Sequence, residues 1–362
     1  MAISALPFVK EKGPDSPIDE LPMQVKNTSY WRYLFYAGAS SIVILIASFI
    51  YAWAAPMLYN KEYSWTESKL KMIKDCDLAP VAFLGDSRVV AGIKPKNLPF
   101  DAVNLGVPGG GPIDSYFLLR KILACPNHPT TVVLSFTAYH FNETDAFFWG
   151  GPVMFGSIDI SDLPSLLRTS YFIGDYWCIF RHGLPRTIKS ALASPALTMK
   201  SLLDGHPMKT LDENRAVERE IILARGYKFF GYHPSPLGDE VKMKSFRVRP
   251  IIDKYFDMMM QLFEANNIRV LFVEFPINQD TAQSSDLEVL AKLSDYLRPY
   301  QIKYPAFDVV NALPIVWKND LFGDLQGHLN VEGANLFTSI VASCVANNSP
   351  SVKAQSLQRC IE

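Results

Sequence analysis

Residues 80–88 read Pro-Val-Ala-Phe-Leu-Gly-Asp-Ser-Arg, and this stretch carries most of the information about the fold. The apolar run 80–84 is typical of a short strand that is buried on both faces. It ends at Gly85, where a glycine lets the chain turn tightly, so that the Ser87 hydroxyl can sit exposed at a strand end. A serine in this place is also an ordinary cap of a helix N-terminus, and the stretch alone leaves both interpretations open.

The alternation of apolar runs and helical patterns continues along the chain. Further strands are predicted at 102–105, 130–136, 269–275 and 306–310, and helices at 112–124, 251–266, 284–298 and 331–346. Short apolar strands separated by helices are typical of a parallel sheet covered on both faces. We therefore predict a three-layer α/β domain whose ligand site lies at the carboxyl ends of the strands.

Residues 141–250 do not follow this alternation. They are rich in aromatic side chains and contain a basic stretch from Arg181 to Lys189. A stretch this long is rarely a bare loop, so we predict an insertion or cap within an α/β domain that spans 79–350. Residues 351–362 are predicted to form a C-terminal tail.

A candidate membrane span lies near the N-terminus. Residues 34–55 carry no formal charge and would cover about 33 Å as a helix, enough for a hydrocarbon core of roughly 30 Å. Aromatic side chains flank both ends, as in an interfacial belt, and Pro56 ends the helix. We predict a single transmembrane helix at 34–55, a flexible tail at 1–33 and a connector at 56–78. A buried core helix and a cleaved signal peptide are the alternatives.

Composition excludes several classes of protein. The 362 residues contain 35 Lys and Arg against 36 Asp and Glu, a net charge of -1, which argues against a nucleic-acid partner. The five cysteines and six histidines show no metal-ligand spacing, so neither a metal nor a cofactor is predicted. One disulfide is possible in an oxidising compartment, but nothing in the sequence requires it. The glycine-rich stretch 106–111 lacks both common nucleotide-binding patterns.

Two further motifs carry candidate chemistry. Residues 322–334 read Phe-Gly-Asp-Leu-Gln-Gly-His-Leu-Asn-Val-Glu-Gly-Ala, so one loop holds Asp324 and His328. A nucleophilic serine needs a base, and the base needs a carboxylate to orient it. Residues 103–112 read Val-Asn-Leu-Gly-Val-Pro-Gly-Gly-Gly-Pro, a strand-to-helix turn that can aim backbone N–H groups at an oxyanion. Alone, each motif also fits an ordinary surface loop or glycine-rich turn.

In their order and placement these motifs resemble the blocks of the SGNH (GDSL-like) hydrolase superfamily, over roughly residues 80–140 and 269–346. The resemblance implies a flavodoxin-like parallel sheet. It also implies Ser87 as nucleophile, His328 as general base and Asp324 as the acid that orients the histidine.

The resemblance also suggests which groups face the substrate. Gly109 is similar to the glycine that donates to the oxyanion beside the N–H of Ser87. Gly110 and Asn104 belong to the same loop and are counted as candidate oxyanion or substrate-binding residues. Arg88 either holds a carboxylate or sugar hydroxyls near the serine, or is a surface charge.

The third block departs from the family pattern. Tyr139 stands where the family has an asparagine that donates to the oxyanion. Its hydroxyl, Thr137 or Asn142 could substitute, or the donor is missing. The loss of one such donor can cost roughly 100- to 1000-fold in rate.

The last block departs in its spacing. The family places its acid three residues before the histidine, whereas Asp324 and His328 are four residues apart. Either the loop bulges by one residue, or Asp320 or Glu274 takes the role of the acid.

One span before such a domain is similar to the accessory proteins of extracytoplasmic acyl transfer, such as the teichoic acid D-alanine transfer and alginate O-acetylation proteins. The resemblance implies a single-pass protein of a bacterial inner membrane, with the C-terminal domain facing the periplasm or the outside. Charge counting around the span does not decide this orientation.

The same resemblance implies an O-acyltransferase or esterase with a Ser-His-Asp mechanism, which takes an acyl donor and a glycan acceptor. A multi-spanning membrane-bound O-acyltransferase is the implied protein partner. The insertion would favour transfer by excluding water. The alternatives are a non-catalytic scaffold or glycan-binding subunit of a polysaccharide-modification complex, and a plain lipid or carbohydrate esterase without partners.

Overall fold

The computed structural model describes residues 27–143, 151, 153–176, 184–204, 209–231, 237–323 and 327–347. The chain divides into two compact units, Met1–Ile46 and Ala47–Glu362. Helix α1 (Asn27–Ala54) begins in the first unit and ends in the second. Its stretch Tyr30–Ala52 is long and apolar enough to cross a membrane, by length and composition, in line with the helix predicted at 34–55. Most of the predicted tail 1–33 and all of 351–362 lie outside the described residues.

The second unit is built on a sheet of five parallel strands in the order β2-β1-β3-β4-β6. The strands are β1 (Val81–Gly85), β2 (Ala102–Asn104), β3 (Thr131–Ser135), β4 (Arg269–Val273) and β6 (Phe307–Asn311). Each overlaps a run predicted as a strand, and β1 and β6 extend one residue beyond the predicted ends. The predicted α/β class with a parallel sheet is therefore confirmed.

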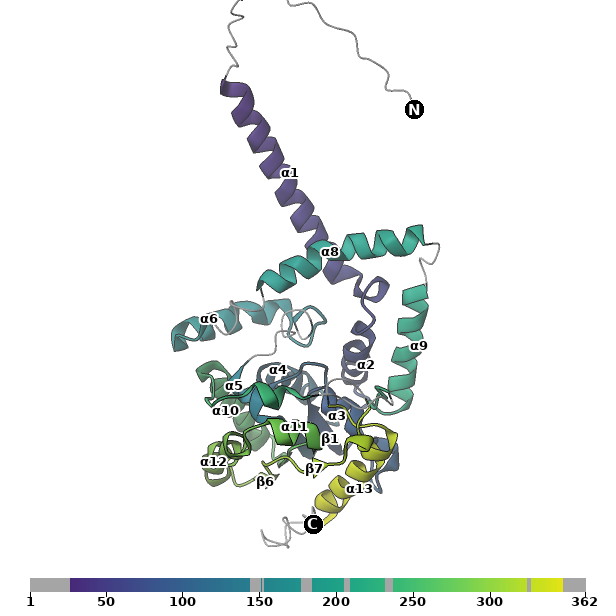
Figure 1. Ribbon diagram of the computed structural model, residues 1–362, viewed down its shortest axis with the longest axis vertical. Coiled ribbons are helices and arrows are strands. Elements are labelled where there is room, and N and C mark those ends of the chain that lie inside the picture. The colour runs from purple at the N-terminus through teal and green to yellow at the C-terminus, as the bar shows by residue number, and fades with distance from the viewer. Residues whose placement is uncertain are drawn as a thin grey trace, which may run out of the picture. The chain divides into compact units, whose positions relative to one another are not determined.

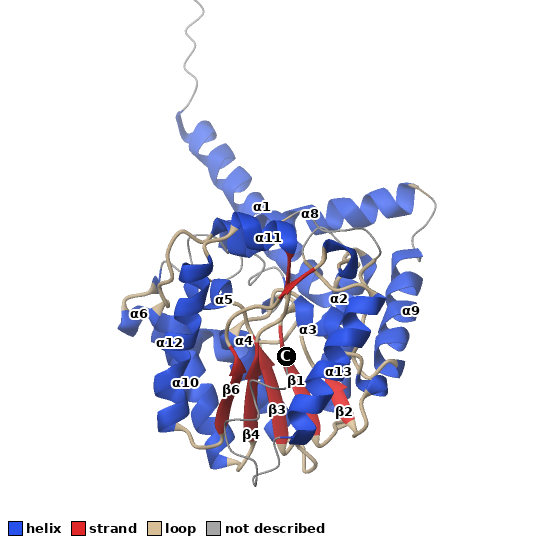
Figure 2. Ribbon diagram, turned by 60° about the horizontal axis from the view of Figure 1, so that its bottom comes forward, coloured by secondary structure: helices blue, strands red, loops and turns tan. Residues whose placement is uncertain are grey.

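Helices cover both faces of this sheet (Figure 2). The helices are α2 (Tyr63–Lys74), α3 (Ser87–Gly92), α4 (Pro112–Leu123), α10 (Pro250–Ala265), α12 (Leu287–Lys303) and α13 (Val331–Asn347). Alternate strand residues enter different cores. Val81 and Phe83 pack with side chains of α3 and α13, whereas Ala82 and Leu84 pack with those of α2, α4, α10 and α12. This period of two explains why the strands read as continuous apolar runs.

Shorter elements sit around the sheet. Helices α5 (Ala138–Asn142) and α11 (Gln279–Ser284) follow β3 and β5, and β5 (Ile277–Asn278) pairs in parallel with β7 (Val316–Trp317). The pair β5–β7 was not predicted, because two-residue strands leave no periodic signal in a sequence.

The predicted insertion 141–250 contains the helices α6 (Leu163–Ile173), α8 (Leu184–Leu203) and α9 (Lys209–Leu223). Helix α9 runs beside α2 (Figure 1). The Asn214 amide donates to the carbonyls of Met57 and Asn60, at 2.8 and 2.9 Å, and Lys71 Nζ lies 2.9 Å from Glu218 Oε1. These bonds make the predicted connector 56–78 part of the larger unit.

A disulfide joins Cys76, just after α2, to Cys125, just after α4, across 49 residues of sequence. The enclosed segment contains β1, α3, β2 and α4, and hence both Ser87 and the glycine-rich turn. Cys344 is buried. A structural disulfide of this kind is typical of a domain that folds in an oxidising compartment.

Loss of this disulfide is expected to destabilise the domain. The chain-entropy treatment of a loop this long gives about 4 kcal/mol, so the double variant Cys76→Ala with Cys125→Ala should melt several degrees lower than the wild type. Thermal unfolding followed by circular dichroism, with and without a reductant, measures the effect. The reductant should lower the wild-type melting temperature and leave that of the double variant unchanged; a wild type that is insensitive to complete reduction would contradict the prediction.

Candidate active site

Ser87 is held at the carboxyl end of β1 by a tight turn. Gly85 has φ 153°, and a Cβ at this position would overlap the carbonyl of Ser135 on the neighbouring strand β3. The Asp86 carboxylate caps α3 by accepting from the Arg88 N–H at 2.8 Å. Ser87 is thus the partly exposed first residue of α3. It lies where β1 is flanked by β2 on one side and β3 on the other, the switch point at which open parallel sheets bind ligands.

His328 meets this serine from the opposite end of the sequence. Its Nε2 lies 2.7 Å from Ser87 Oγ, and the histidine is buried. When the imidazole carries its proton on Nδ1, the serine hydroxyl donates to Nε2, the geometry of a serine paired with its base.

Backbone contacts join His328 and Leu329 to Phe322 and Gly323. The Gly323 N–H donates to the His328 carbonyl at 2.8 Å, and Phe322 bridges Leu329 in antiparallel fashion. Asn330 then accepts from the N–H groups of Glu332 and Gly333, both at 3.0 Å. These bonds start α13 immediately after the histidine, so the position of His328 is tied to the sheet through that helix.

An aromatic ring from the insertion stacks on the histidine. The centroids of Phe230 and His328 are 4.3 Å apart with an interplanar angle of 29°, and Trp65 of α2 meets Phe230 edge-on at 4.9 Å. The next residue, Gly231, is in backbone contact with Gly323, so neither position has room for a side chain. The insertion therefore supplies one wall of the site.

A buried lysine holds this part of the insertion in place. Lys69 is completely buried, and its Nζ donates to the carbonyls of Gly226 and, at 2.8 Å, Asn104. Burial holds the pKa of Lys69 well below its usual value. The Asn104 N–H also donates to the Arg225 carbonyl at 2.9 Å. These contacts attach residues 225–226 to the end of β2.

The glycine-rich turn lies against the Ser87 loop. The Val107 N–H donates to the Gly85 carbonyl at 3.0 Å, and the Gly110 N–H donates to the Val107 carbonyl at 3.0 Å. The Gly110 N–H is thus used within the turn itself. Gly109 has φ 63° and is half-buried, and its N–H makes no hydrogen bond within the described part of the chain. It remains the candidate oxyanion donor of this turn, beside the N–H of Ser87, which has no acceptor within its own helix.

Asn104 was expected among the groups that face the substrate, but it lies inside the domain. Its side chain is completely buried, donates to the carbonyls of Val89 and Ile93 at 2.6 and 3.0 Å, and accepts from the Gly106 N–H at 3.1 Å. All of the hydrogen bonds of its side chain go to backbone groups, so the Asn104 side chain joins α3 to the glycine-rich turn.

Arg88 also differs from the expectation that it is a substrate ligand or a surface charge. Its side chain is buried, with Nη1 2.5 Å from Glu240 Oε1 and Nε 3.9 Å from Asp86 Oδ2. Burial by itself would lower the pKa of Arg88, but the Glu240 and Asp86 carboxylates raise it above its usual value. Arg88 is therefore an internal cation beneath the Ser87 turn.

Two more titratable side chains, His140 and Glu274, lie near Asp86, Arg88 and Glu240. His140 Nε2 lies 3.4 Å from Asp86 Oδ2, and His140 Nδ1 lies 3.1 Å from Thr137 Oγ1. Glu274 is completely buried. Burial and the nearby Glu240 carboxylate raise the pKa of Glu274 well above its usual value, so the anionic form is disfavoured and Glu274 is poorly suited to orient His328 as an anion.

The remaining candidates for the acid and the third donor are placed as follows. Asp324 lies outside the described residues. The Asp320 side chain is exposed, and its backbone carbonyl accepts from Asn330 Nδ2 at 2.6 Å. Tyr139 is half-buried on α5 with its ring 5.9 Å from that of His140. Asn142 Oδ1 accepts from the Arg247 N–H at 3.0 Å, so Asn142 anchors the end of the insertion.

Sequence reasoning missed three residues of this site: Phe230, His140 and Glu240. His140 directly follows Tyr139 in the third block, and its position shortly after a strand end is a signal that the sequence contains. Phe230 and Glu240 lie in the insertion, where no motif pointed to them. Their places depend on contacts with residues more than 90 positions away.

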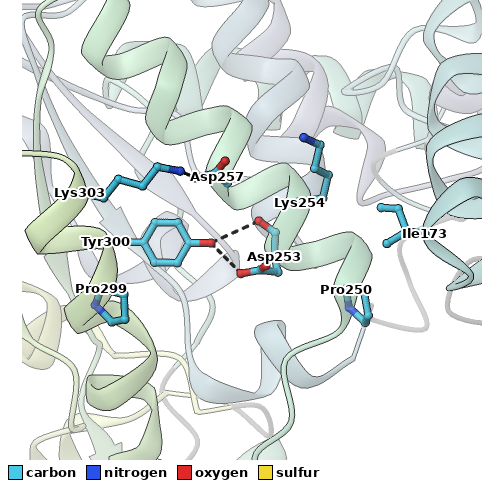
Figure 3. A pocket seen from close by; sticks show the side chains of 8 residues that line it. All are labelled: Ile173, Pro250, Asp253, Lys254, Asp257, Pro299, Tyr300 and Lys303. Atoms are coloured by element: carbon cyan, nitrogen blue, oxygen red, sulfur yellow. Dashed lines mark hydrogen bonds and ion pairs between the residues drawn. The ribbon is translucent and has the colours of Figure 1, made fainter.

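The described residues contain no group of three or more His, Cys, Asp or Glu side chains that could hold a metal ion. A cavity of about 540 Å³ lies away from the serine, between α10 and α12 (Figure 3). Four of its lining side chains pair between the two helices: Tyr300 Oη donates to Asp253 Oδ1 at 2.6 Å, and Lys303 Nζ lies 2.6 Å from Asp257 Oδ1.

No family model, no curated protein and no solved structure is significantly similar to this chain.

Glu274 makes stability depend on pH. Its pKa is raised in the folded state, so its contribution to stability is present below the unfolded value of 4.5 and is lost as pH rises toward the folded value. Relative to the wild type, Glu274→Gln should gain stability as the pH rises above 4.5. Urea unfolding at a series of pH values measures the difference. The exposed Glu264→Gln is the matched control, and identical pH profiles for wild type and Glu274→Gln would refute the expectation.

Proposed function

We propose that this protein is a membrane-anchored, extracytoplasmic serine O-acyltransferase or esterase of the SGNH-like type, which moves an acyl group to or from a cell-surface or secreted polysaccharide. The observation that carries the proposal is the 2.7 Å separation between His328 Nε2 and Ser87 Oγ. A serine and a histidine that are 241 residues apart in sequence meet at the ligand-binding edge of a parallel sheet, as nucleophilic catalysis requires.

The strand order supports the SGNH-like part of the proposal. Counted over the strands of the main sheet, β2-β1-β3-β4-β6 is the order 2-1-3-4-5 of flavodoxin-like folds. The serine follows the first strand, the glycine-rich turn follows the second, and the histidine precedes the last helix. This is the order of blocks that the resemblance implies.

The proposed reaction has two transfers. Ser87 Oγ attacks the carbonyl carbon of an acyl donor while its proton moves to His328 Nε2. The tetrahedral oxyanion is held by the N–H groups of Ser87 and Gly109. The bond to the donor oxygen then breaks, the leaving oxygen takes the proton from His328, and an ester on Ser87 remains. An acceptor hydroxyl, from a sugar or from water, gives its proton to His328 and attacks this ester, and Ser87 recovers its proton as it leaves.

The environment of His328 supports this role. Phe230 excludes water from one face of the imidazole and limits its rotation. Asp324 remains the proposed orienting acid, because the raised pKa of Glu274 and the exposure of Asp320 make both of them weaker choices. The insertion is part of the proposed site, because its deletion would remove Phe230 and Glu240.

The extracytoplasmic location has two supports. One N-terminal helix is long and apolar enough to cross a membrane, and the disulfide Cys76–Cys125 suits an oxidising compartment. The proposed substrates, an acyl donor and a glycan acceptor, and the proposed multi-spanning O-acyltransferase partner follow from this location and from the family resemblance. A non-catalytic scaffold would not need a histidine within hydrogen-bond distance of a partly exposed serine.

The first test is covalent labelling of the full-length, detergent-solubilised protein with a fluorophosphonate probe. Labelling should disappear in Ser87→Ala, because the probe modifies only an activated serine. In His328→Gln the rate should fall by at least about 100-fold, the usual contribution of a general base. Ser339→Ala, which removes an exposed serine on α13, should label like the wild type. Equal labelling of wild type and Ser87→Ala would refute the proposed nucleophile.

Phe230 is expected to act as a positioning residue for the base. An aromatic pair contributes roughly 0.5–1.5 kcal/mol, so Phe230→Ala should slow labelling of Ser87 by up to about tenfold, and Phe230→Trp should restore it by keeping the stack. The thermal unfolding of both variants is measured in parallel, to separate loss of orientation from loss of folding. If Phe230→Ala folds and labels at the wild-type rate, the stack has no part in positioning His328.

A further inference from the structure

Helix α8, in the insertion, presents apolar side chains to its surroundings. Leu192, Met199 and Leu203 are 45%, 57% and 81% exposed. Their spacings of seven and four residues place them on one face of the helix, and Leu197 and Leu202 are also exposed. A contiguous exposed apolar stripe on a folded domain is typical of a binding surface.

Another face of α8 contacts the end of the apolar helix α1. Ser194 is completely buried, and one turn later Thr198 Oγ1 accepts a hydrogen bond from Tyr51 Oη at 2.6 Å. Tyr51 is the penultimate residue of the stretch Tyr30–Ala52 that could cross a membrane, and it belongs to the same compact unit as α8. Because each helical residue rises only about 1.5 Å, Tyr51 lies close to the end of that stretch. If α1 spans a bilayer, its hydrogen bond to Thr198 therefore places α8 at the edge of the hydrocarbon core.

The charges of α8 are all positive. Its sequence contains Arg186, Lys189 and Lys200 and no acidic residue, and Lys189 and Lys200 are exposed. An apolar stripe flanked by lysines is the pattern of a helix that lies in a membrane surface, with its lysine heads among anionic headgroups.

We propose that α8 is an interfacial helix, which lies in the plane of the bilayer surface. Leu192, Met199 and Leu203 enter the boundary between headgroups and acyl chains, and Lys189 and Lys200 bind anionic lipid headgroups. This inference rests on the membrane anchor of the proposed function and goes beyond it: the larger unit contacts the lipid surface with its own helix.

The test is site-directed spin labelling of the full chain in vesicles of phosphatidylcholine with phosphatidylglycerol, at a low protein-to-lipid ratio. Met199→Cys and Leu203→Cys carry the label, in a chain that keeps the Cys76–Cys125 disulfide and has alanine at Cys178, Cys344 and Cys360. Collisions with oxygen report the apolar phase, and collisions with a water-soluble nickel complex report the aqueous phase. The matched control is Ile302→Cys on α12, since Ile302 is 80% exposed and Leu203 is 81% exposed. A label at Ile44→Cys reports the proposed span.

The expected result is an oxygen-to-nickel collision ratio several-fold higher at positions 199 and 203 than at 302, with position 44 higher still. If position 44 is in the acyl phase and positions 199 and 203 are as aqueous as 302, the interfacial helix is refuted and the anchor stands. If position 44 is itself aqueous, the anchor fails and the inference fails with it. Protection at 199 and 203 that grows with the protein-to-lipid ratio identifies contact between protein copies and overturns the lipid proposal.

The headgroup preference has its own test. Reversing both charges, with Lys189→Glu and Lys200→Glu, should lower the collision ratio at position 203 in anionic vesicles and leave it unchanged in pure phosphatidylcholine. Lys244→Glu, an exposed lysine outside α8, should change neither value. An unchanged ratio in anionic vesicles after the double reversal would overturn the binding of anionic headgroups.

Discussion

The hydrogen bond between His328 Nε2 and Ser87 Oγ, 2.7 Å long, is the interaction around which the rest of the domain is arranged. Its two partners sit at opposite ends of the α/β chain. They meet because all strands of the sheet run in parallel, so that their carboxyl ends share one edge. The turn at Gly85 and the capping of α3 by Asp86 position the serine. The contacts of Phe322 with Leu329 and of Gly323 with His328 position the histidine.

The insertion belongs to the site rather than covering it. Lys69 and Asn104 bind residues 225–226 at the end of β2, and the chain then brings Phe230 onto His328. Glu240, which also belongs to the insertion, pairs with Arg88 next to the Ser87 turn. A buried cation held by two carboxylates is costly to form from unpaired partners. The contacts of Arg88 with Glu240 and of Asp86 with His140 therefore hold the insertion, α3 and α5 in one arrangement.

The same insertion contacts both the candidate site and the end of α1 that belongs to the larger unit. Helix α9 binds α2 and the residues that follow α1, and α8 contacts Tyr51. Residues of one insertion thus pack against the His328 side chain and against the C-terminal end of α1.

The amino-acid sequence was enough to predict the parallel α/β sheet, the apolar N-terminal helix and the pairing of a serine after the first strand with a histidine before the last helix. These follow from local patterns: continuous apolar runs, a charge-free stretch and short motifs next to strand ends. The folded structure is needed to show that Arg88 and Asn104 face inward, that Glu274 is buried near Arg88, and that Phe230 packs on His328. Burial and pairing of a polar side chain depend on which distant residues surround it, and a single sequence contains no local signal of those neighbours.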